Sequence, residues 1–172
     1  MERTPSVALL TVSDRSFLAL REDLAGPLLA ARVGVWGWKL LGAEILSDDS
    51  TGVSAALRRW ADDRGADLIL TTGGTGLSPR DQVPEATLAV ADRLVPGIPE
   101  WIRARSAAEH PHACLSRGLA VLRGGCLIVN LPGSPRAVAE YLDALELVLP
   151  HALAQARQGP TWGQGDAHTG GR

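Results

Sequence analysis

The sequence predicts a three-layer α/β/α sandwich around a mostly parallel sheet, with one antiparallel hairpin late in the chain. Short apolar runs that suit strands alternate with longer segments whose apolar residues recur at helical spacing. Strands that alternate with helices form parallel sheets with helices on both faces. Two apolar runs, 119–123 and 126–131, are separated only by Gly124 and Gly125, which indicates a hairpin.

Three apolar runs give the expected parallel strands. Val7 to Ser13 reads VALLTVS and is continuous, as in a central strand that is covered on both faces. Lys39 to Ser47 gives the second strand, and Leu68 to Thr72 gives the third.

The segments between these strands carry helical stripes. One helix is expected at Gly26-Pro27, with an inner stripe of Leu24, Leu28, Ala31 and Val35. The next covers 53–64, is anchored at its start by Ser50 or Thr51, ends at Gly65 and buries Val53, Ala56, Leu57, Trp60 and Ala61.

Further helices are expected over 84–93 and 99–109. A final helix has Pro150 kinking or ending it and buries Val138, Tyr141, Leu142, Leu145 and Leu149. Residues 1–156 therefore form one α/β domain. Residues 157–172 carry little apolar surface besides Trp162, so a flexible C-terminal tail is expected there.

The stretch from Leu68 to Thr87 has the layout of an anion site. Its strand runs into a loop whose glycines lack Cβ atoms, so a ligand can approach the backbone N–H groups. Arg80 and Asp81 follow, and Pro84 begins a helix. The loop has no Walker lysine, and Pro79 stands where a dinucleotide fingerprint needs its third glycine. A plain tight turn is the alternative.

Polar residues lie at four strand ends and should converge on one cleft, because the carboxyl ends of parallel strands share an edge. They are Ser13, Asp14 and Arg15, the pair Asp48 and Asp49, the loop 72–81, and the loop 130–134. The residues alone leave open whether Asp14 binds a ligand or caps a turn, and helix capping would account for one of the two neighbouring aspartates.

The charges at these strand ends suit a phosphate and a metal ion together. Positive charge would come from Arg15, Arg80 and Arg117. The carboxylates would repel a phosphate unless a divalent cation bridges them to the phosphate oxygens. We therefore expect Mg²⁺.

The remaining composition excludes several classes of function. A net charge of −2 argues against nucleic acid as a partner. No apolar leader precedes the first strand and no run is long enough to span a bilayer, so no membrane partner and a cytoplasmic location are expected. Cys114 and Cys126 should be free thiols, and His110 and His112 lack the spacing of a zinc site.

The string TTGGTG, followed by Arg80-Asp81 and PEAT, resembles the MoaB/Mog family of molybdopterin-binding proteins. The likeness includes Thr11–Arg15, Asp48-Asp49, Leu115–Arg117 and 130–135, so five separated motifs follow the order of the family. Two departures are Val83, where threonine is usual, and the segment 16–20, which lacks the glycine and tyrosine common there.

The resemblance implies a role in molybdenum cofactor biosynthesis, because Mog-type members are molybdopterin adenylyltransferases. In that reaction the terminal phosphate of molybdopterin attacks the α-phosphorus of ATP and releases pyrophosphate. The two essential carboxylates of the family fall on Asp48 and Asp81, the expected catalytic and Mg²⁺-binding residues. The nucleophile is already ionised at neutral pH, so positioning and charge stabilisation are expected to carry catalysis.

The other expected site residues bind ATP or molybdopterin. The resemblance places Thr75 and Gly76 on the substrate loop, Ser116 on a phosphate-binding serine, and 132–134 at the lip of the site. Arg117 is added because a guanidinium beside Ser116 suits a phosphate; alternatively Ser116 caps a turn and Arg117 lies in solvent. The full set is Ser13, Asp14, Arg15, Gly73, Gly74, Thr75, Gly76, Arg80, Ser116, Arg117, Pro132, Gly133 and Ser134.

The resemblance also implies a homotrimer and a downstream partner that inserts molybdenum. Five tryptophans leave large apolar groups for an interface, unless most of them are core residues, namely Trp36, Trp38, Trp60 and Trp101. A non-catalytic pterin- or nucleotide-binding module of the same fold is the alternative function. The presence of both Asp48 and Asp81 favours catalysis, because anion binding alone gives no reason to keep acids nearby.

Overall fold

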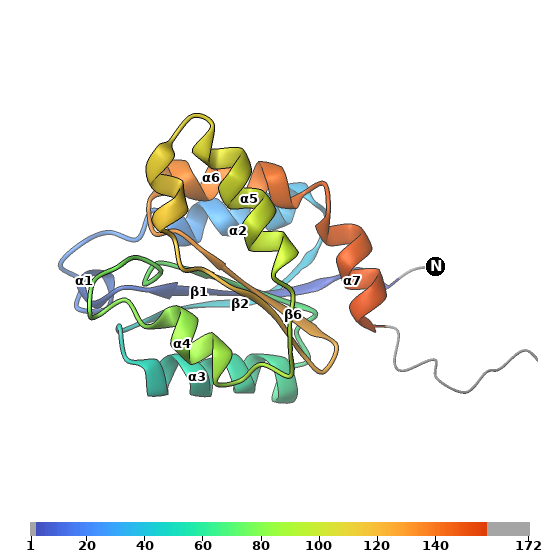
Figure 1. Cartoon of the computed structure of the whole chain (residues 1–172). Coiled ribbons are helices and arrows are strands. Elements are labelled where there is room, and N and C mark those ends of the chain that lie inside the picture. The colour runs from blue at the N-terminus through green and yellow to red at the C-terminus, as the bar shows by residue number, and fades with distance from the viewer. Residues whose placement is uncertain (1–2, 158–172) are drawn as a thin grey trace, which may run out of the picture.

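A computed structural model describes residues 3–157, which form one six-stranded sheet between two layers of helices (Figure 1). The strand order is β2-β1-β3-β6-β5-β4. The first four strands in this order are parallel, whereas β5 runs antiparallel to β6 and β4 antiparallel to β5. The strands are β1 (Ser6–Val12), β2 (Lys39–Leu46), β3 (Leu68–Thr72), β4 (Arg93–Leu94), β5 (Ala120–Arg123) and β6 (Cys126–Leu131). The predicted fold class and the late hairpin are confirmed.

Side chains of the central strands alternate between two apolar cores. In β1, Val7 and Leu9 face the core on one side of the sheet, whereas Ala8 and Leu10 face the core on the other side. The first core lies under α2 (Ala25–Val35), α5 (Gly97–Ala107), α6 (Pro135–Leu145) and α7 (Leu149–Arg157). The second core lies between the sheet and the helices α3 (Ser50–Arg58) and α4 (Val83–Leu88), which cover the face opposite to α2, α5 and α6 (Figure 1).

Helix α2 buries a different stripe from the predicted one. Its buried residues are Ala25, Gly26, Leu29 and Val33, while Leu24 and Val35 are exposed. Gly26 explains the rotation, because a Cβ there would lie 2.3 Å from Asp23 Oδ2 and 3.1 Å from Thr11 Oγ1. The helix therefore turns its smallest residue toward the end of β1, and the stripe shifts by one position.

Helix α3 keeps its predicted stripe but begins earlier than expected. Asp49, not Ser50 or Thr51, is the N-cap, and its carboxylate accepts a hydrogen bond from the Gly52 N–H at 2.7 Å. The helix continues into a π-turn over Arg59–Asp63. Of the tryptophans, Trp60 is buried, whereas Trp36, Trp38 and Trp101 pack against the first core as half-buried residues.

Two predicted helices in the second half of the chain are wrong in extent. The helix expected over 84–93 ends at Leu88, and Arg93 instead begins β4. A strand of two residues is too short to show an alternating pattern in the sequence. The expected final helix is two helices, and Pro150 lies in the first turn of α7, where a missing N–H costs nothing. Arg157 is the last residue of α7, and the rest of the predicted tail, 158–172, lies outside the described residues.

Two short helices complete the described chain: α1 (Asp14–Phe17) and a 3₁₀ helix over Pro111–Leu115. Both cysteines carry free thiols, Cys114 exposed and Cys126 buried. Among residues 3–157, no helix combines the length and the apolar character that crossing a bilayer would require.

Candidate active site

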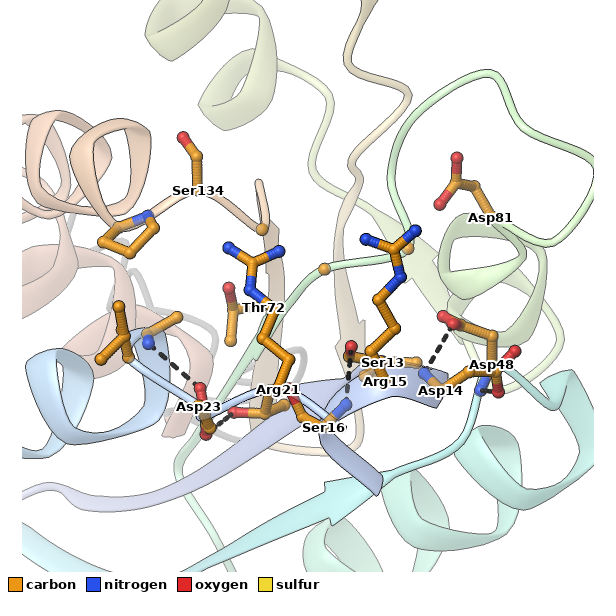
Figure 2. Close-up of a pocket in the computed structure, with 18 of the residues that line it drawn as sticks. Ser13, Asp14, Arg15, Ser16, Arg21, Asp23, Asp48, Thr72, Asp81 and Ser134 are labelled. Carbon is orange, nitrogen blue, oxygen red and sulfur yellow. Dashed lines mark hydrogen bonds between the residues drawn. The ribbon is translucent and has the colours of Figure 1, made fainter. Parts of the chain in front are cut away.

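A pocket of about 550 Å³ lies at the carboxyl edge of the parallel strands (Figure 2). It is lined by the ends of β1, β2, β3 and β6 and by the loop that precedes α2, so the predicted convergence of strand ends is confirmed. Ten of the expected site residues line it: Ser13, Asp14, Arg15, Asp48, Gly73, Gly74, Arg80, Asp81, Gly133 and Ser134.

Asp14 and Asp48 lock the ends of β1 and β2 together. Asp48 Oδ2 accepts a hydrogen bond from the Asp14 N–H, and Asp14 Oδ1 accepts one from the Asp48 N–H, both at 2.9 Å. Arg80 Nε also donates to Asp14 Oδ2 at 3.1 Å. The hydrogen bond from the Asp48 backbone, followed by that from Arg80, lowers the pKa of Asp14. Asp14 is thus an ionised structural residue at the rim of the pocket.

The glycine loop makes room for the protein's own groups. A Cβ on Gly74 would lie 2.5 Å from Val83 Cγ2 and 3.5 Å from Asp48 Oδ1. A Cβ on Gly76 would lie 2.9 Å from Asp81 Oδ2. Gly74 therefore makes room for the Val83 side chain and Gly76 for the Asp81 carboxylate, which is a different use from the predicted approach of a ligand to bare backbone.

Asp48 and Asp81 each keep one carboxylate oxygen available. Asp48 uses Oδ2 to accept from Asp14, and Asp81 uses Oδ2 to accept from the Ser78 N–H at 2.9 Å. Within the described residues, Oδ1 of each carboxylate accepts no hydrogen bond. Free carboxylate oxygens suit Mg²⁺, which takes one or two carboxylates and completes its shell with water and substrate phosphate. No group of three or more potential protein ligands lies together in residues 3–157, so a closed metal cage is absent from that part.

Arg117 and Thr75 lie outside the pocket. The Arg117 N–H donates to the Thr75 carbonyl at 2.9 Å, and its Nε donates to the Gly76 carbonyl at 2.8 Å. The guanidinium also donates to the Asp81 carbonyl. It forms an ion pair with Glu85 as well, and its hydrogen bond to the Glu85 carboxylate lowers the pKa of Glu85. Arg117 is therefore a brace of the glycine loop. Neither expectation for it, as a phosphate ligand or as a solvated residue, matches this geometry.

A second, smaller pocket of about 290 Å³ adjoins the first. Ser134 lines both pockets, whereas Ser116 and Pro132 line only the smaller one. Its other walls come from the end of α5, the 3₁₀ helix and α6: Ser106, His110, His112, Ala113, Arg136, Ala137, Glu140 and Tyr141. Burial raises the pKa of Tyr141, so its phenol stays neutral at physiological pH. Of the expected substrate residues, Thr75, Gly76 and Arg117 line neither pocket.

Several residues that line the larger pocket were not among the expected site residues; Asp23 and Arg21 are two of them, and Thr72 belongs to the predicted loop 72–81 without a role of its own. Thr72 Oγ1 donates to the Pro132 carbonyl at 2.7 Å and ties the loops after β3 and β6 together. Asp23 Oδ1 accepts from the N–H groups of Ala25 and Gly26, each at 3.0 Å, so it caps the start of α2. An aspartate just before a helix was a readable signal for that cap. Arg21 had no such signal, because only the folded loop brings it to the pocket.

Comparison with known proteins places the chain in a family. Residues 8–151 match the family model described as "Probable molybdopterin binding domain". A molybdopterin adenylyltransferase of Haemophilus influenzae is 38% identical over 146 residues, which cover 81% of this chain and 72% of that protein. The molybdenum cofactor synthesis protein cinnamon of Drosophila melanogaster is 37% identical over 147 residues, and the match spans 84% of this chain but only 24% of that relative.

The fold agrees with these sequence matches. A crystal structure of the molybdopterin biosynthesis enzyme MoaB from Thermus thermophilus superposes with a TM-score of 0.86 at 43% identity, over 91% of this chain and 99% of that one. The chain that carries this strand order, this glycine loop and this pair of carboxylates is therefore similar to these proteins along most of its length. The chain belongs to the molybdopterin-binding domain family.

Proposed function

We propose that the chain is a molybdopterin adenylyltransferase that uses ATP and Mg²⁺. The observation that carries this proposal is the pair Asp48 and Asp81, each with one unengaged oxygen beside the glycine loop. The pocket of about 550 Å³ at this pair is within the usual size range of small-molecule sites. The names of the relatives support the same activity.

ATP would occupy the larger pocket. Arg15 in α1, just after β1, contributes positive charge there, and Ser13 contributes a hydroxyl group. Asp48 and Asp81 would hold Mg²⁺, which when bound neutralises charge on the phosphate oxygens. Because the glycine loop is fixed by the Arg117 brace, Asp81 is held in place before the substrate arrives.

Molybdopterin would occupy the smaller pocket. Its apolar walls suit the face of a pterin ring, and Ser116 offers a hydroxyl group. Ser134 belongs to both pockets, so a phosphate beside it could meet the α-phosphorus of ATP in the neighbouring pocket. This phosphate is ionised at neutral pH and needs no general base, so alignment of two bound substrates supplies most of the rate enhancement.

Several finer features belong to the same proposal. The enzyme acts in the cytoplasm and passes its product to a molybdenum-insertion protein. It assembles as a homotrimer, and the exposed apolar side chains beside α1, which include Phe17, Leu18 and Leu20, are surface that an assembly would cover. Sedimentation at micromolar concentration checks the trimer, and a monomer there would contradict it.

The experiment for the activity uses ATP labelled at the α-phosphate, Mg²⁺ and molybdopterin. The expected result is transfer of the label to molybdopterin, together with an equal amount of pyrophosphate. Omission of molybdopterin should abolish both signals. Tight binding of molybdopterin without any pyrophosphate would instead support the alternative, a non-catalytic pterin-binding module.

A further inference from the structure

Arg21 projects into the larger pocket beside Arg15. Figure 2 shows both side chains extending from the β1 side of the pocket toward the side on which Ser134 and Asp81 lie. Within residues 3–157, neither of the two guanidinium groups donates a hydrogen bond or forms an ion pair. Arg80, in contrast, is held by Asp14. Two free cations therefore face the same space.

The backbone holds Arg21 in this position. The N–H groups of Leu20 and Arg21 both donate to the Arg15 carbonyl, at 2.8 and 3.2 Å. The chain folds back through Ala19, whose φ of +54° makes it the one non-glycine residue with positive φ in the described part. Two residues beyond Arg21, the capping bonds of Asp23 fix the chain to the start of α2. Arg21 is thus anchored on both sides.

Of the three arginines that line the pocket, Arg15 and Arg21 are available to an anion, because Arg80 is paired with Asp14. Five carboxylates and three guanidinium groups line the pocket, so its formal charge is −2. Asp14 is neutralised by Arg80, and Asp23 accepts from two backbone N–H groups and the Thr11 hydroxyl. An anion can enter such a pocket only if free positive charge faces it.

We propose that Arg21, together with Arg15, binds a phosphate group of a substrate. The identity of the substrates rests on the proposed function, but the phosphate-binding role of Arg21 does not follow from it, because Arg21 lies outside every motif shared with the family. Each guanidinium group presents two parallel N–H donors that match the oxygens of a phosphate. The phosphate belongs either to the triphosphate of ATP or to the terminal phosphate of molybdopterin, and the experiment separates the two.

The test measures binding at physiological ionic strength, with Mg²⁺ present, for the wild type, Arg21→Ala, Arg21→Lys and Arg64→Ala. Arg64 is the matched control, because it is exposed after the π-turn, ahead of the amino end of β3. The ligands are ATP, adenosine, molybdopterin and dephosphorylated molybdopterin. Loss of one charge-assisted contact should weaken a phosphate ligand about 10- to 100-fold in Arg21→Ala and less in Arg21→Lys. The phosphate-free ligands and the Arg64→Ala protein should stay within about twofold.

The outcomes separate this inference from the proposed function. A loss confined to ATP assigns Arg21 to the triphosphate, and a loss confined to molybdopterin assigns it to the terminal phosphate. Unchanged affinity for both ligands, or equal losses for the phosphate-free compounds, would overturn the assignment. A wild type that binds ATP through Arg21 but releases no pyrophosphate with molybdopterin would refute the enzymatic function and leave Arg21 in place. A wild type that binds neither substrate would refute both.

Discussion

Asp67 at the amino end of the parallel sheet and the pair Asp48 and Asp81 at its carboxyl end differ in how many hydrogen bonds their carboxylates accept. At the amino end, the side chain of Asp67 is only 6% exposed and accepts from the Ser6 N–H at 2.8 Å, the Ser6 hydroxyl at 2.6 Å and Arg157 Nε at 3.0 Å. At the carboxyl end, Asp48 and Asp81 each accept one backbone hydrogen bond and keep an oxygen free. A saturated buried acid can only stabilise the fold, whereas an unsaturated acid in a pocket can bind a ligand.

Asp67 also shows how a buried acid stays ionised. Burial alone would raise its pKa, but the hydrogen bonds from Ser6 and then from Arg157 outweigh that effect, and the pKa is lowered. The backbone of Asp67 donates to the Ser6 carbonyl and accepts from the Leu127 N–H, both at 2.9 Å. One residue thus joins β1, β3 and β6 at the amino edge.

The largest effect is expected at the carboxyl end, from Asp48→Asn. This substitution keeps size and an acceptor for the Asp14 N–H but removes the charge that would hold Mg²⁺. Pyrophosphate release should fall by about 100-fold or more, with the free energy of unfolding changed by less than about 0.5 kcal/mol.

The neighbouring Asp49 provides the matched control. It caps α3, and asparagine caps a helix as well as aspartate does. Asp49→Asn should therefore keep both activity and stability. Similar turnover in the two variants would remove Asp48 from the mechanism.

The second effect belongs to the amino end, where Asp67→Ala should lower the free energy of unfolding by about 3 kcal/mol. The loss arises because the Ser6 N–H is left without its partner and Arg157 loses its buried carboxylate. Urea unfolding measures it, with Asp63→Ala, an exposed site in the π-turn, as the control. Turnover per folded molecule should not change. A lower turnover per folded molecule in Asp67→Ala would contradict the purely structural role of Asp67.

The pH dependence of stability should sharpen the same contrast. Folding lowers the pKa of Asp67 from its ordinary value of 3.8. The contribution of Asp67 to the free energy of unfolding is therefore complete above pH 3.8 and is lost as the pH falls toward the folded pKa. Urea unfolding of the wild type between about pH 5 and pH 3 should therefore show a steeper loss of stability than unfolding of Asp67→Asn. Identical slopes for the two proteins would show that Asp67 has the same pKa in both states.

Sequence reasoning could place the acids at the carboxyl end, because the strand ends and the parallel sheet fix which edge they share. It could also anticipate that one of Asp48 and Asp49 caps a helix, since capping needs only local information. Which of them caps was settled by the start of α3. The stripe of α2 was misassigned, because the close contact of Gly26 with Thr11 depends on packing between segments that are distant along the chain.

The roles of the arginines were the least predictable part of the site. Arg117 reaches the carbonyls of Gly76 and Asp81, and that contact exists only once the glycine loop is folded. Arg21 enters the pocket through the turn at Ala19, a conformation that sequence patterns assign to glycine. Long cationic side chains contact residues that are distant in the sequence, so the spacing of motifs along the chain does not predict these contacts.

The smallest effect is expected for Arg117→Ala, which removes the brace of the loop. Its side chain is 36% exposed, so the free energy of unfolding should fall by only about 1 kcal/mol after allowance for solvent screening. Turnover should fall several-fold, because Asp81 loses its support. Calorimetric titration with molybdopterin and with its dephosphorylated analogue should show equal small losses. A loss confined to the phosphorylated ligand would restore the phosphate-binding role expected from the sequence.

Asp81→Asn gives the most direct test of the account, because turnover and molybdopterin affinity can be measured on the same preparation. Asparagine can still accept from the Ser78 N–H, so the loop should keep its shape. We expect pyrophosphate release to collapse while molybdopterin binds within about twofold of the wild type, since only a charge is lost. A variant that releases pyrophosphate at the wild-type rate would contradict the claim that the free oxygens at this end of the sheet serve catalysis.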